Sequence, residues 1–370
     1  MTQSNDEYAR LGIDYRKMGP WKDAVVEMGR TTFSFPSRYN VVVEPDGTYW
    51  YLGRGSPRWR SVTEGLGHKN LIAEWMYQNA GTGRTYHEHI GEDVMLMAVN
   101  DLKGALPVVY TDEVASGSSE WYEDRQRTAD LISGFFRECQ RDGIALVGGE
   151  SPALPLLIRT EPYVPSAPSF SGCCVGIIPP GRSPITGEKL RAGDRIIGVR
   201  STGLHSNGST LIIRRSQQLS EQLLTRLPNG NTLGEEALIP TRSYVGLIEA
   251  LLEAKVEIHT IVPGTGGGLR KIASDKRPFT YRIHSWIARD DIPPLFLFMR
   301  ELGVTLEDCV KTFNWGIGEY LFVPSHEVVR TIEIGMRAGY ELLEVGRVEE
   351  GERKVVFEPE GGIVLPPPEE

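Results

Sequence analysis

The glycine-rich run GTGGG at residues 264–268 restricts the fold of this chain more than any other segment. It follows a segment with strand character, 256–263, and precedes one with helical character that starts near Leu269. Glycine loses more conformational freedom on folding than any other residue, so three in succession are unfavourable in a plain connection. The run therefore predicts a strand, a tight loop and a helix, with the loop backbone close to a phosphate. Its spacing is neither GxGxxG nor GxxxxGK[ST], which excludes the dinucleotide and P-loop fingerprints.

Three acidic residues stand in or beside glycine-containing turns and are candidate magnesium ligands: Glu64, Asp101 and Glu150. Carboxylate oxygens are hard ligands of the kind that Mg²⁺ prefers. Neighbouring glycines would let the backbone approach a phosphate, and a lysine would add positive charge; these residues are Gly65, Gly67, Lys69, Gly148 and Gly149. Each segment also has an ordinary interpretation, as a solvated hairpin turn, a helix end and a strand-ending turn respectively.

A compact polar loop, STGLHSNG at 201–208, contains His205 and Asn207 between two glycines. It stands directly before a predicted helix, whose first N–H groups favour an anion. A lone histidine is often structural, and that interpretation stays open for His205. His87 and His89 lack the HExxH spacing of a metal site, so we interpret their segment as solvated.

Length and pattern together predict two domains of mixed secondary structure. The chain has 370 residues, 40% of them hydrophobic, and a Pro- and Gly-containing stretch predicts a boundary near residue 180. We expect an N-terminal domain at 1–180 and a C-terminal domain at 181–370. Strands and helices do not alternate strictly, which favours an α+β fold. Among the helices, the pattern predicts segments over 21–28, 121–143 and 209–226.

Charge and composition exclude several classes of protein. The net charge of −9 argues against general nucleic-acid binding, which requires a basic surface. The amino terminus lacks the features of a signal peptide, and no apolar stretch approaches the ~18 residues of a membrane span. The four cysteines form no CxxC pair, so we interpret them as reduced core thiols. We therefore expect a cytoplasmic protein with neither nucleic acid nor a membrane as partner.

Taken in order, these segments resemble the aminoimidazole ribonucleotide synthetase family, also called phosphoribosylformylglycinamidine cyclo-ligase. EGLGHK (64–69) is similar to its DGVGTK, and LVGGESPALP (146–155) to its LVGGETAEMP. GDRIIGVRSTGLHSNGSTLIIR (193–214) is similar to its GD…SxGxHSNGxSLxR. Further matches are GEDVMLMAVNDLKGALPVVYTDEVASG (91–117), IPTRSYV (239–245), GTGGGL (264–269) and FNWGIG (313–318). The resemblance covers nearly the whole chain, and an ordered set of this length is highly specific.

The resemblance implies an N-terminal α/β domain that pairs between subunits into the barrel of a homodimer, followed by a C-terminal α/β domain. It implies ATP and Mg²⁺ as cofactors. It also implies a small ribonucleotide substrate, formylglycinamidine ribonucleotide, whose amide oxygen is phosphorylated before the ring closes. The residue roles implied are metal binding by Glu64, Asp101 and Glu150, phosphate binding by Lys69, Gly266, Gly267 and Gly268, and catalysis by His205, Asn207 and Lys69.

The chain also departs from the family pattern near these residues. It has Glu64 where the family has Asp, His68 for Thr, Ala153 for Glu, Pro263 for His and Glu319 for Met. The family's glycine-rich amino-terminal loop, which folds over ATP, is replaced by MGRTTFSFP at 28–36. Two alternatives therefore stay open. One is another ATP-dependent enzyme of the superfamily, which includes thiamine-monophosphate kinase and selenophosphate synthetase; the other is a nucleotide-binding paralogue without turnover.

Overall fold

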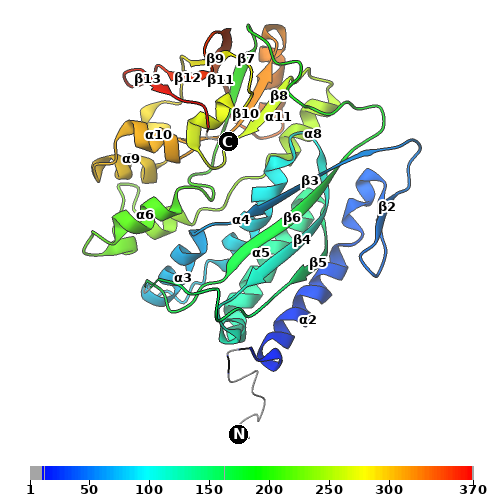
Figure 1. The fold of residues 1–370 in the computed structure, drawn as a ribbon, viewed down its shortest axis with the longest axis vertical. Helices are drawn as coiled ribbons and strands as arrows, with labels where there is room; N and C mark the ends of the chain where they lie inside the picture. Colours follow the sequence, from blue (N-terminus) through cyan, green and yellow to red (C-terminus); the bar gives the residue numbers. More distant parts are fainter. Residues whose placement is uncertain (1–10, 12, 162, 369–370) are drawn as a thin grey trace, which may run out of the picture. The chain divides into compact units, whose positions relative to one another are not determined.

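The computed structural model describes residues 11, 13–161 and 163–368, and the chain forms two compact units (Figure 1). Unit 1 comprises Met1–Leu102 and Pro107–Gly181, and unit 2 comprises Lys103–Leu106 and Arg182–Glu370. Each unit combines helices with a β-sheet of its own, so the predicted α+β fold is confirmed. In the described part of the chain, no helix is both long and apolar enough to cross a membrane.

Unit 1 is built on a four-stranded sheet in the spatial order β3, β6, β4, β5. These strands are β3 (Arg58–Gly65), β6 (Ser169–Ile178), β4 (Leu106–Ala115) and β5 (Ala145–Glu150). β3 pairs with β6 in antiparallel register, whereas β4 and β5 run parallel. A separate two-stranded hairpin consists of β1 (Val41–Val43) and β2 (Tyr49–Tyr51).

Two long helices, α4 (His87–Val99) and α5 (Arg125–Asp142), pack against one another, and α4 also packs on β3 and β6. α5 begins after Asp124, whose side chain accepts a hydrogen bond from the Arg127 N–H, and ends at Gly143 with a φ of 73°. This is the usual pairing of an acidic N-cap with a left-handed glycine. The shorter α3 (Lys69–Asn79) follows β3 directly.

Alternate side chains of β3, among them Ser61 and Thr63, are exposed on one face of the unit 1 sheet.

α2 (Tyr15–Thr32) lies along β5, which is an edge strand of the sheet (Figure 1). At one end of the contact, the Trp21 Nε1–H donates to Ser151 Oγ at 2.9 Å. At the other end, the Leu146 N–H donates to Thr32 Oγ1 at 2.8 Å. The helix therefore covers part of an edge that would otherwise expose unpaired backbone groups.

Unit 2 contains a seven-stranded sheet in the order β13, β12, β9, β11, β7, β10, β8. The strands are β7 (Arg195–Arg200), β8 (Thr260–Pro263), β9 (Phe279–Ile283), β10 (Ile317–Val323), β11 (Leu342–Glu350), β12 (Lys354–Phe357) and β13 (Ile363–Leu365). β10 pairs antiparallel with both β7 and β8. As a result, β10 begins at the edge of the sheet where β7 and β8 end.

The core of unit 2 forms where helices pack on this sheet. Its helices are α6 (Ser209–Ser216), α7 (Leu233–Ala237), α8 (Val245–Glu253), α9 (Pro294–Glu301), α10 (Leu306–Thr312) and α11 (Val328–Arg337). Apolar side chains of α8 and α11 join those of β7 and β10 in one cluster, which includes Leu247, Leu251, Ile197 and Leu321. All four of these side chains are fully buried. This packing holds the ends of β7 and β10 in a fixed relation.

The structure differs from the sequence-based expectations at several element boundaries. The helix predicted at 21–28 is part of the longer α2, and the helix predicted at 121–143 begins only at Arg125 because residues 119–123 form a 3₁₀-helix. The helix predicted at 209–226 is wrong beyond Ser216. Gln222 has a φ of 49°, which an α-helix does not accommodate. Residues 28–36 form the end of α2 and the start of a 3₁₀-helix.

The four cysteines are free thiols, as predicted. Cys139, Cys174 and Cys309 are buried, and Cys173 is partly exposed. Burial raises the pKa of the Cys139 thiol far above its ordinary value, so this group stays protonated and unreactive.

The packing of α2 on β5 can be tested with two glycines of the same helix. A Cβ at Gly29 would lie 2.7 Å from the Leu146 carbonyl oxygen, whereas a Cβ at Gly19 would meet nothing within 4 Å. We expect Gly29→Ala to destabilise the protein by about 1–3 kcal/mol, because the helix must move off the strand. Gly19→Ala is the control and should lower stability less, because the new Cβ crowds only the ring of the following Pro20. Equal decreases of the two thermal unfolding midpoints would contradict the close contact.

Candidate functional site

In unit 2, three polar loops meet at the edge of the sheet where β7 and β8 end and β10 begins. One is the loop 201–208 after β7, the second is the GTGGG run after β8, and the third is residues 313–316 before β10. Edges where several strands end are common places for a site, because rigid strands position flexible loops. These are three of the segments that the sequence singled out.

Asn314 connects two of these loops through its side-chain amide. Its Oδ1 accepts hydrogen bonds from Ser201 Oγ at 3.1 Å and from the Gly316 N–H at 2.9 Å. Its Nδ2 donates to the Gly203 carbonyl at 2.8 Å. Because Asn314 is almost completely buried, these bonds fix the start of the histidine loop relative to β10.

His205 lies in this loop with a φ of 58°, an uncommon conformation for a residue other than glycine. Its side chain is buried, and its Nε2 lies 3.5 Å from the hydroxyl group of Tyr244. The Tyr244 hydroxyl also donates to the Arg200 carbonyl at 3.2 Å. Burial, and secondarily the charge of Glu319, raises the pKa of Tyr244, so its hydroxyl remains protonated. The imidazole is therefore held in one orientation.

The GTGGG run faces the histidine loop. A Cβ at Gly266 would lie 3.1 Å from Asn207 Oδ1, so these two predicted site residues are brought together. Gly267 and Gly268 have φ values of 95° and 56°. A Cβ at Gly268 would also collide with the Val310 carbonyl. The run is thus required both by its left-handed backbone and by close packing. The helix predicted after it is a short 3₁₀-helix, Gly268–Ala273.

Polar atoms of the histidine loop are buried without protein partners. Ser206 Oγ, Asn207 Nδ2 and Ser209 Oγ find no hydrogen-bonding partner among the residues that the structure describes. Such atoms are rare in folded proteins, and leaving one unsatisfied costs about 1–3 kcal/mol. Their concentration in one loop, opposite a glycine run, is the arrangement expected of a site for a polar ligand.

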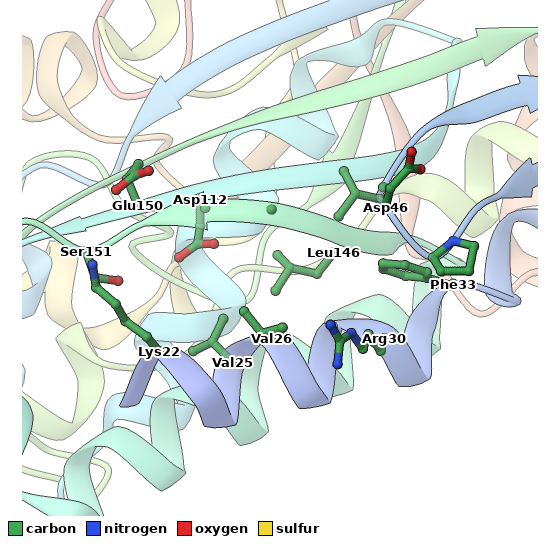
Figure 2. A pocket seen from close by; sticks show the side chains of 16 residues that line it. Lys22, Val25, Val26, Arg30, Phe33, Asp46, Asp112, Leu146, Glu150 and Ser151 are labelled. Carbon is green, nitrogen blue, oxygen red and sulfur yellow. The ribbon is translucent and has the colours of Figure 1, made fainter. Parts of the chain in front are cut away.

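In unit 1, a cavity of about 260 Å³ lies between α2 and β5 (Figure 2). Gly148, Gly149 and Glu150 form part of its wall, as does Asp112 of the neighbouring strand β4. The carboxyl group of Asp112 occupies the space that a Cβ at Gly149 would need. The missing side chain at Gly149 therefore leaves room for this carboxyl group at the cavity wall.

Asp112 is the residue with the most perturbed acidity in this region. It is 6% exposed, and burial raises its pKa from 3.8 to about 7, with a further contribution from the negative charge of Glu150. Its Oδ1 has no hydrogen-bonding partner within the described ranges. The group is thus poised between its neutral and charged forms near physiological pH.

The three predicted metal ligands do not converge on one point, because Glu64 and Glu150 lie on opposite edges of the sheet. Glu64 is in β3 and Glu150 in β5, the two outermost strands of the sheet, so about three strand spacings of ~4.8 Å separate them. Asp101 lies in the 3₁₀-turn Asn100–Leu102, which packs against β3. Across residues 11, 13–161 and 163–368, no group of three or more His, Cys, Asp or Glu side chains is arranged to hold a metal ion.

The first predicted turn, at 64–69, is not a hairpin. Glu64 and Gly65 end strand β3, Gly67 has a φ of 72°, and α3 starts at Lys69. Lys69 is fully buried, with its Nζ 2.7 Å from a carboxylate oxygen of the equally buried Asp93. Burial lowers the pKa of Lys69, and Asp93 opposes that shift. Direct binding of a phosphate by Lys69 would require this ion pair to open.

The interpretation of the His87 segment as solvated is wrong. His87 is fully buried at the start of α4, with its Nε2 3.2 Å from Glu74 Oε1. Trp121 Nε1–H donates to the same carboxylate at 2.6 Å. His87 therefore belongs to a buried polar network, a tertiary contact that residue spacing does not reveal.

Comparison with known proteins gives the family. The domain described as AIR synthase related protein, N-terminal domain, matches residues 61–178, and the corresponding C-terminal domain matches residues 191–358. Phosphoribosylformylglycinamidine cyclo-ligase of Syntrophus aciditrophicus is 33% identical over 307 residues, covering 80% of this chain and 82% of the relative. The protein of the same name from Pyrococcus horikoshii is 33% identical over 353 residues, covering 94% and 96%. The chain belongs to the AIR synthase family.

Solved structures support the same fold for this AIR synthase family protein. Thiamine-monophosphate kinase from Stenotrophomonas maltophilia has a TM-score of 0.58 at 18% identity, covering 91% of this chain and 96% of that structure. The hydrogenase maturation protein HypE in complex with ATP has a TM-score of 0.59 at 14% identity, covering 87% and 88%. At these identities the likeness concerns the fold alone.

Three residues at these places were not among the sequence-based candidates: Asp112, Tyr244 and Asn314. The sequence could have indicated Asn314, because this residue stands within the quoted FNWGIG segment, between an apolar residue and a glycine turn. Asp112 was indicated more weakly, as an acidic residue inside a segment predicted to be a buried strand. Tyr244 stands within the quoted IPTRSYV segment, but the segment does not reveal that its hydroxyl reaches His205, a contact that arises only from the packing of the chain.

The raised pKa of Asp112 predicts a pH-dependent stability. Since its pKa is about 7 in the folded state and 3.8 ordinarily, the folded protein binds more protons between these values. Stability contributed by the neutral group is therefore lost as the pH rises toward 7 and above, by up to about 4 kcal/mol. Asp112→Asn should remove this loss, so the variant should gain stability relative to the wild type between about pH 5 and about pH 8.

Glu113→Gln is the control for this prediction. It removes the same charge at the next position of the strand, from an exposed side chain that accepts a hydrogen bond from Ser171, so it should not show this pH-dependent gain. The measurement is the unfolding midpoint of the wild type and of both variants at about pH 5 and at about pH 8. A difference between Asp112→Asn and the wild type that is the same at both pH values would contradict the raised pKa.

Proposed function

We propose that this AIR synthase family protein is a phosphoribosylformylglycinamidine cyclo-ligase, which uses ATP to convert formylglycinamidine ribonucleotide into aminoimidazole ribonucleotide in the cytoplasm. The observation that carries the proposal is the identity of 33% to proteins of that name, extending over 94% of this chain in the Pyrococcus horikoshii relative. Agreement over both domains supports a shared reaction more strongly than agreement of one domain would.

The reaction places few covalent demands on the protein. The amide oxygen of the substrate attacks the γ-phosphorus of ATP, and ADP leaves. The amidine nitrogen then attacks the activated carbon, the ring closes, and the phosphate leaves with the former amide oxygen. Catalysis of this kind depends on positioning and on stabilising charge at the transferred phosphoryl group.

The unit 2 loops supply groups suited to the substrate. We assign His205 and Asn207 to polarising the amide or moving a proton, and Gly266, Gly267 and Gly268 to holding a phosphate through backbone N–H groups. The buried, unsatisfied Ser206 Oγ and Asn207 Nδ2 support this assignment, since a ligand would provide the partners they lack. His205 is kept in place by Tyr244, which would limit the motion of the imidazole during proton transfer.

The unit 1 residues supply groups suited to ATP and magnesium. Mg²⁺ in such sites usually takes one or two carboxylates and completes its shell with phosphate oxygens and waters, so a cage of three protein ligands is not required. Magnesium would neutralise phosphate charge. We assign Glu64 and Asp101, whose elements pack together, to one ion and Glu150 to another, with Gly65, Gly67, Gly148 and Gly149 beside the phosphates. We also assign Lys69 to phosphate binding, which requires its buried ion pair with Asp93 to open when the ligand binds.

We further propose that the protein is a homodimer in which the exposed face of the unit 1 sheet meets a second copy. Trp59 of β3 is 42% exposed, and Ser61 and Thr63 are exposed on the same face. Val175 of β6, the partner of Ser61 in the sheet, is only partly buried. A sheet with one mixed, uncovered face is a suitable surface for self-association.

The ligase proposal predicts that the purified protein forms the product and that this activity depends on Asn207. Purified protein with ATP, Mg²⁺ and formylglycinamidine ribonucleotide should release phosphate and form aminoimidazole ribonucleotide. Asn207→Ala should lower kcat by about 10²-fold or more, because a group acting on the reacting atoms is lost. Phosphate release no higher than in an ATP-only control would reject the ligase assignment in favour of a binding protein without turnover.

The metal assignment predicts a selective effect of Asp101→Asn. The variant should bind ATP at least about tenfold more weakly in the presence of Mg²⁺, because one anionic ligand is lost, while its melting temperature stays nearly unchanged. Asp23→Asn, an exposed substitution on α2, is the control and should leave affinity unaltered. Calorimetry that finds wild-type affinity in a folded Asp101→Asn protein would refute the metal role.

A further inference from the structure

Glu319 is a carboxylate buried near the start of β10, beside the three loops of unit 2. Its side chain is 1% exposed, and burying a charged group is costly unless a group of opposite charge lies close to it. The family pattern has an apolar Met at this position, so the carboxylate is a feature of this chain. A buried carboxylate at the edge of a site is a candidate for a functional role.

Strand register places Glu319 on the face of the sheet that carries Tyr244. Glu319 lies directly opposite Val199 of β7, and residues that are opposite one another in a sheet project to the same face. Val199 packs in the core cluster that also contains Tyr244. The negative charge of Glu319 contributes to the raised pKa of the Tyr244 hydroxyl, as expected of neighbouring groups.

The imidazole of His205 lies at the same place. A Cβ at Gly318, the residue before Glu319, would collide with His205 Cε1 and with the Tyr244 hydroxyl. The pairing of β10 with β7 shifts register between Ile317 and Glu319, and irregularities of this kind change the direction in which a side chain points. The glycine therefore lets the imidazole contact the backbone of β10 immediately beside the carboxylate.

The other charged and titratable groups that act on Tyr244 are Arg242, Tyr320 and Tyr340. The Arg242 guanidinium lies over the ring of Tyr340, 4.4 Å from its centroid, and donates to a backbone carbonyl at the surface. Burial raises the pKa of Tyr320 far above its ordinary value, so its hydroxyl stays neutral. His205 is 2% exposed, so its imidazole is a buried group that can balance a buried carboxylate.

We propose that Glu319 and His205 form a buried ion pair beside Tyr244, in which the carboxylate keeps the imidazole protonated. Burial of the ring favours its neutral form, but an adjacent carboxylate favours the charged form, and without this cation the buried carboxylate would be uncompensated. A protonated ring polarises an amide oxygen and cannot accept a proton. The inference rests on the proposed ligase function. It makes Glu319 a positioning residue that selects polarisation of the amide as the role of His205.

NMR titration of the imidazole signals of the full-length protein tests the ion pair without requiring ligase activity. The His205 signal is assigned by its loss in His205→Asn. Glu319→Gln keeps the shape of the side chain but removes its charge, so His205 should lose its proton at a pH at least about one unit lower than in the wild type. Glu341→Gln is the matched control. It removes an exposed carboxylate beside Arg200 at the same edge of the sheet and should leave this midpoint nearly unchanged.

A measurement on the wild type alone covers the case in which Glu319→Gln does not fold. The ring of His205 should lose its proton at a pH at least about one unit above that of His284, whose side chain is exposed. Loss of the proton at an equal or lower pH would overturn the proposal. An unchanged His205 midpoint in a folded Glu319→Gln protein would overturn it as well.

The ion pair also predicts the pH profile of the reaction. The kcat of the wild type should fall on the alkaline side as His205 loses its proton, and in Glu319→Gln this fall should begin about one pH unit lower. Glu319→Asp, which keeps the charge, should lie closer to the wild type. Identical profiles of the wild type and Glu319→Gln would overturn the role given to Glu319. A shifted NMR midpoint in a protein that forms no aminoimidazole ribonucleotide would support the ion pair while rejecting the ligase assignment.

Discussion

The antiparallel pairing of β10 with β7 and β8 is the constraint on which the unit 2 site depends. Because β10 runs opposite to both neighbours, its first residues lie at the edge where the other two strands end. Three loops far apart in the sequence therefore meet there. Asn314 then connects the loop before β10 with the loop after β7, and the glycine run after β8 packs against Asn207. The chemistry of His205 follows from this pairing rather than from its own neighbours in the sequence.

The cavity of unit 1 also depends on how the elements pack, because it lies where α2 covers the edge strand β5. Among the strands that the structure describes, β5 pairs with β4 alone, and α2 occupies its other side through contacts at Trp21 and Thr32. Between these contacts, Gly148 and Gly149 provide no side chains, and Asp112 extends into the space that remains. The same glycines that suggest a phosphate loop in the sequence thus also create a cavity behind the strand.

Two departures from the family pattern are neighbours in space. Pro263 and Glu319 are direct cross-strand partners in β8 and β10, so a change at one position alters the surroundings of the other. Pro263 is tolerated because β8 is an edge strand, where a missing N–H need not disrupt the ladder. Glu319 is 1% exposed, and its charge contributes to the raised pKa of Tyr244. The other two substitutions have different surroundings, because the side chain of His68 is exposed to solvent whereas that of Ala153 is buried.

The sequence by itself determined the α+β class, most of the strands and the segments that form the loops, because apolar periodicity and glycine runs are local properties. It also determined the family, through the order of its motifs. Only the tertiary structure decided which candidates meet. Asn207 and the GTGGG run come together through strand pairing, whereas Glu64 and Glu150 lie on opposite edges of one sheet. Lys69 is buried against Asp93, and Asp112 enters a cavity, because burial depends on contacts between residues distant in the chain.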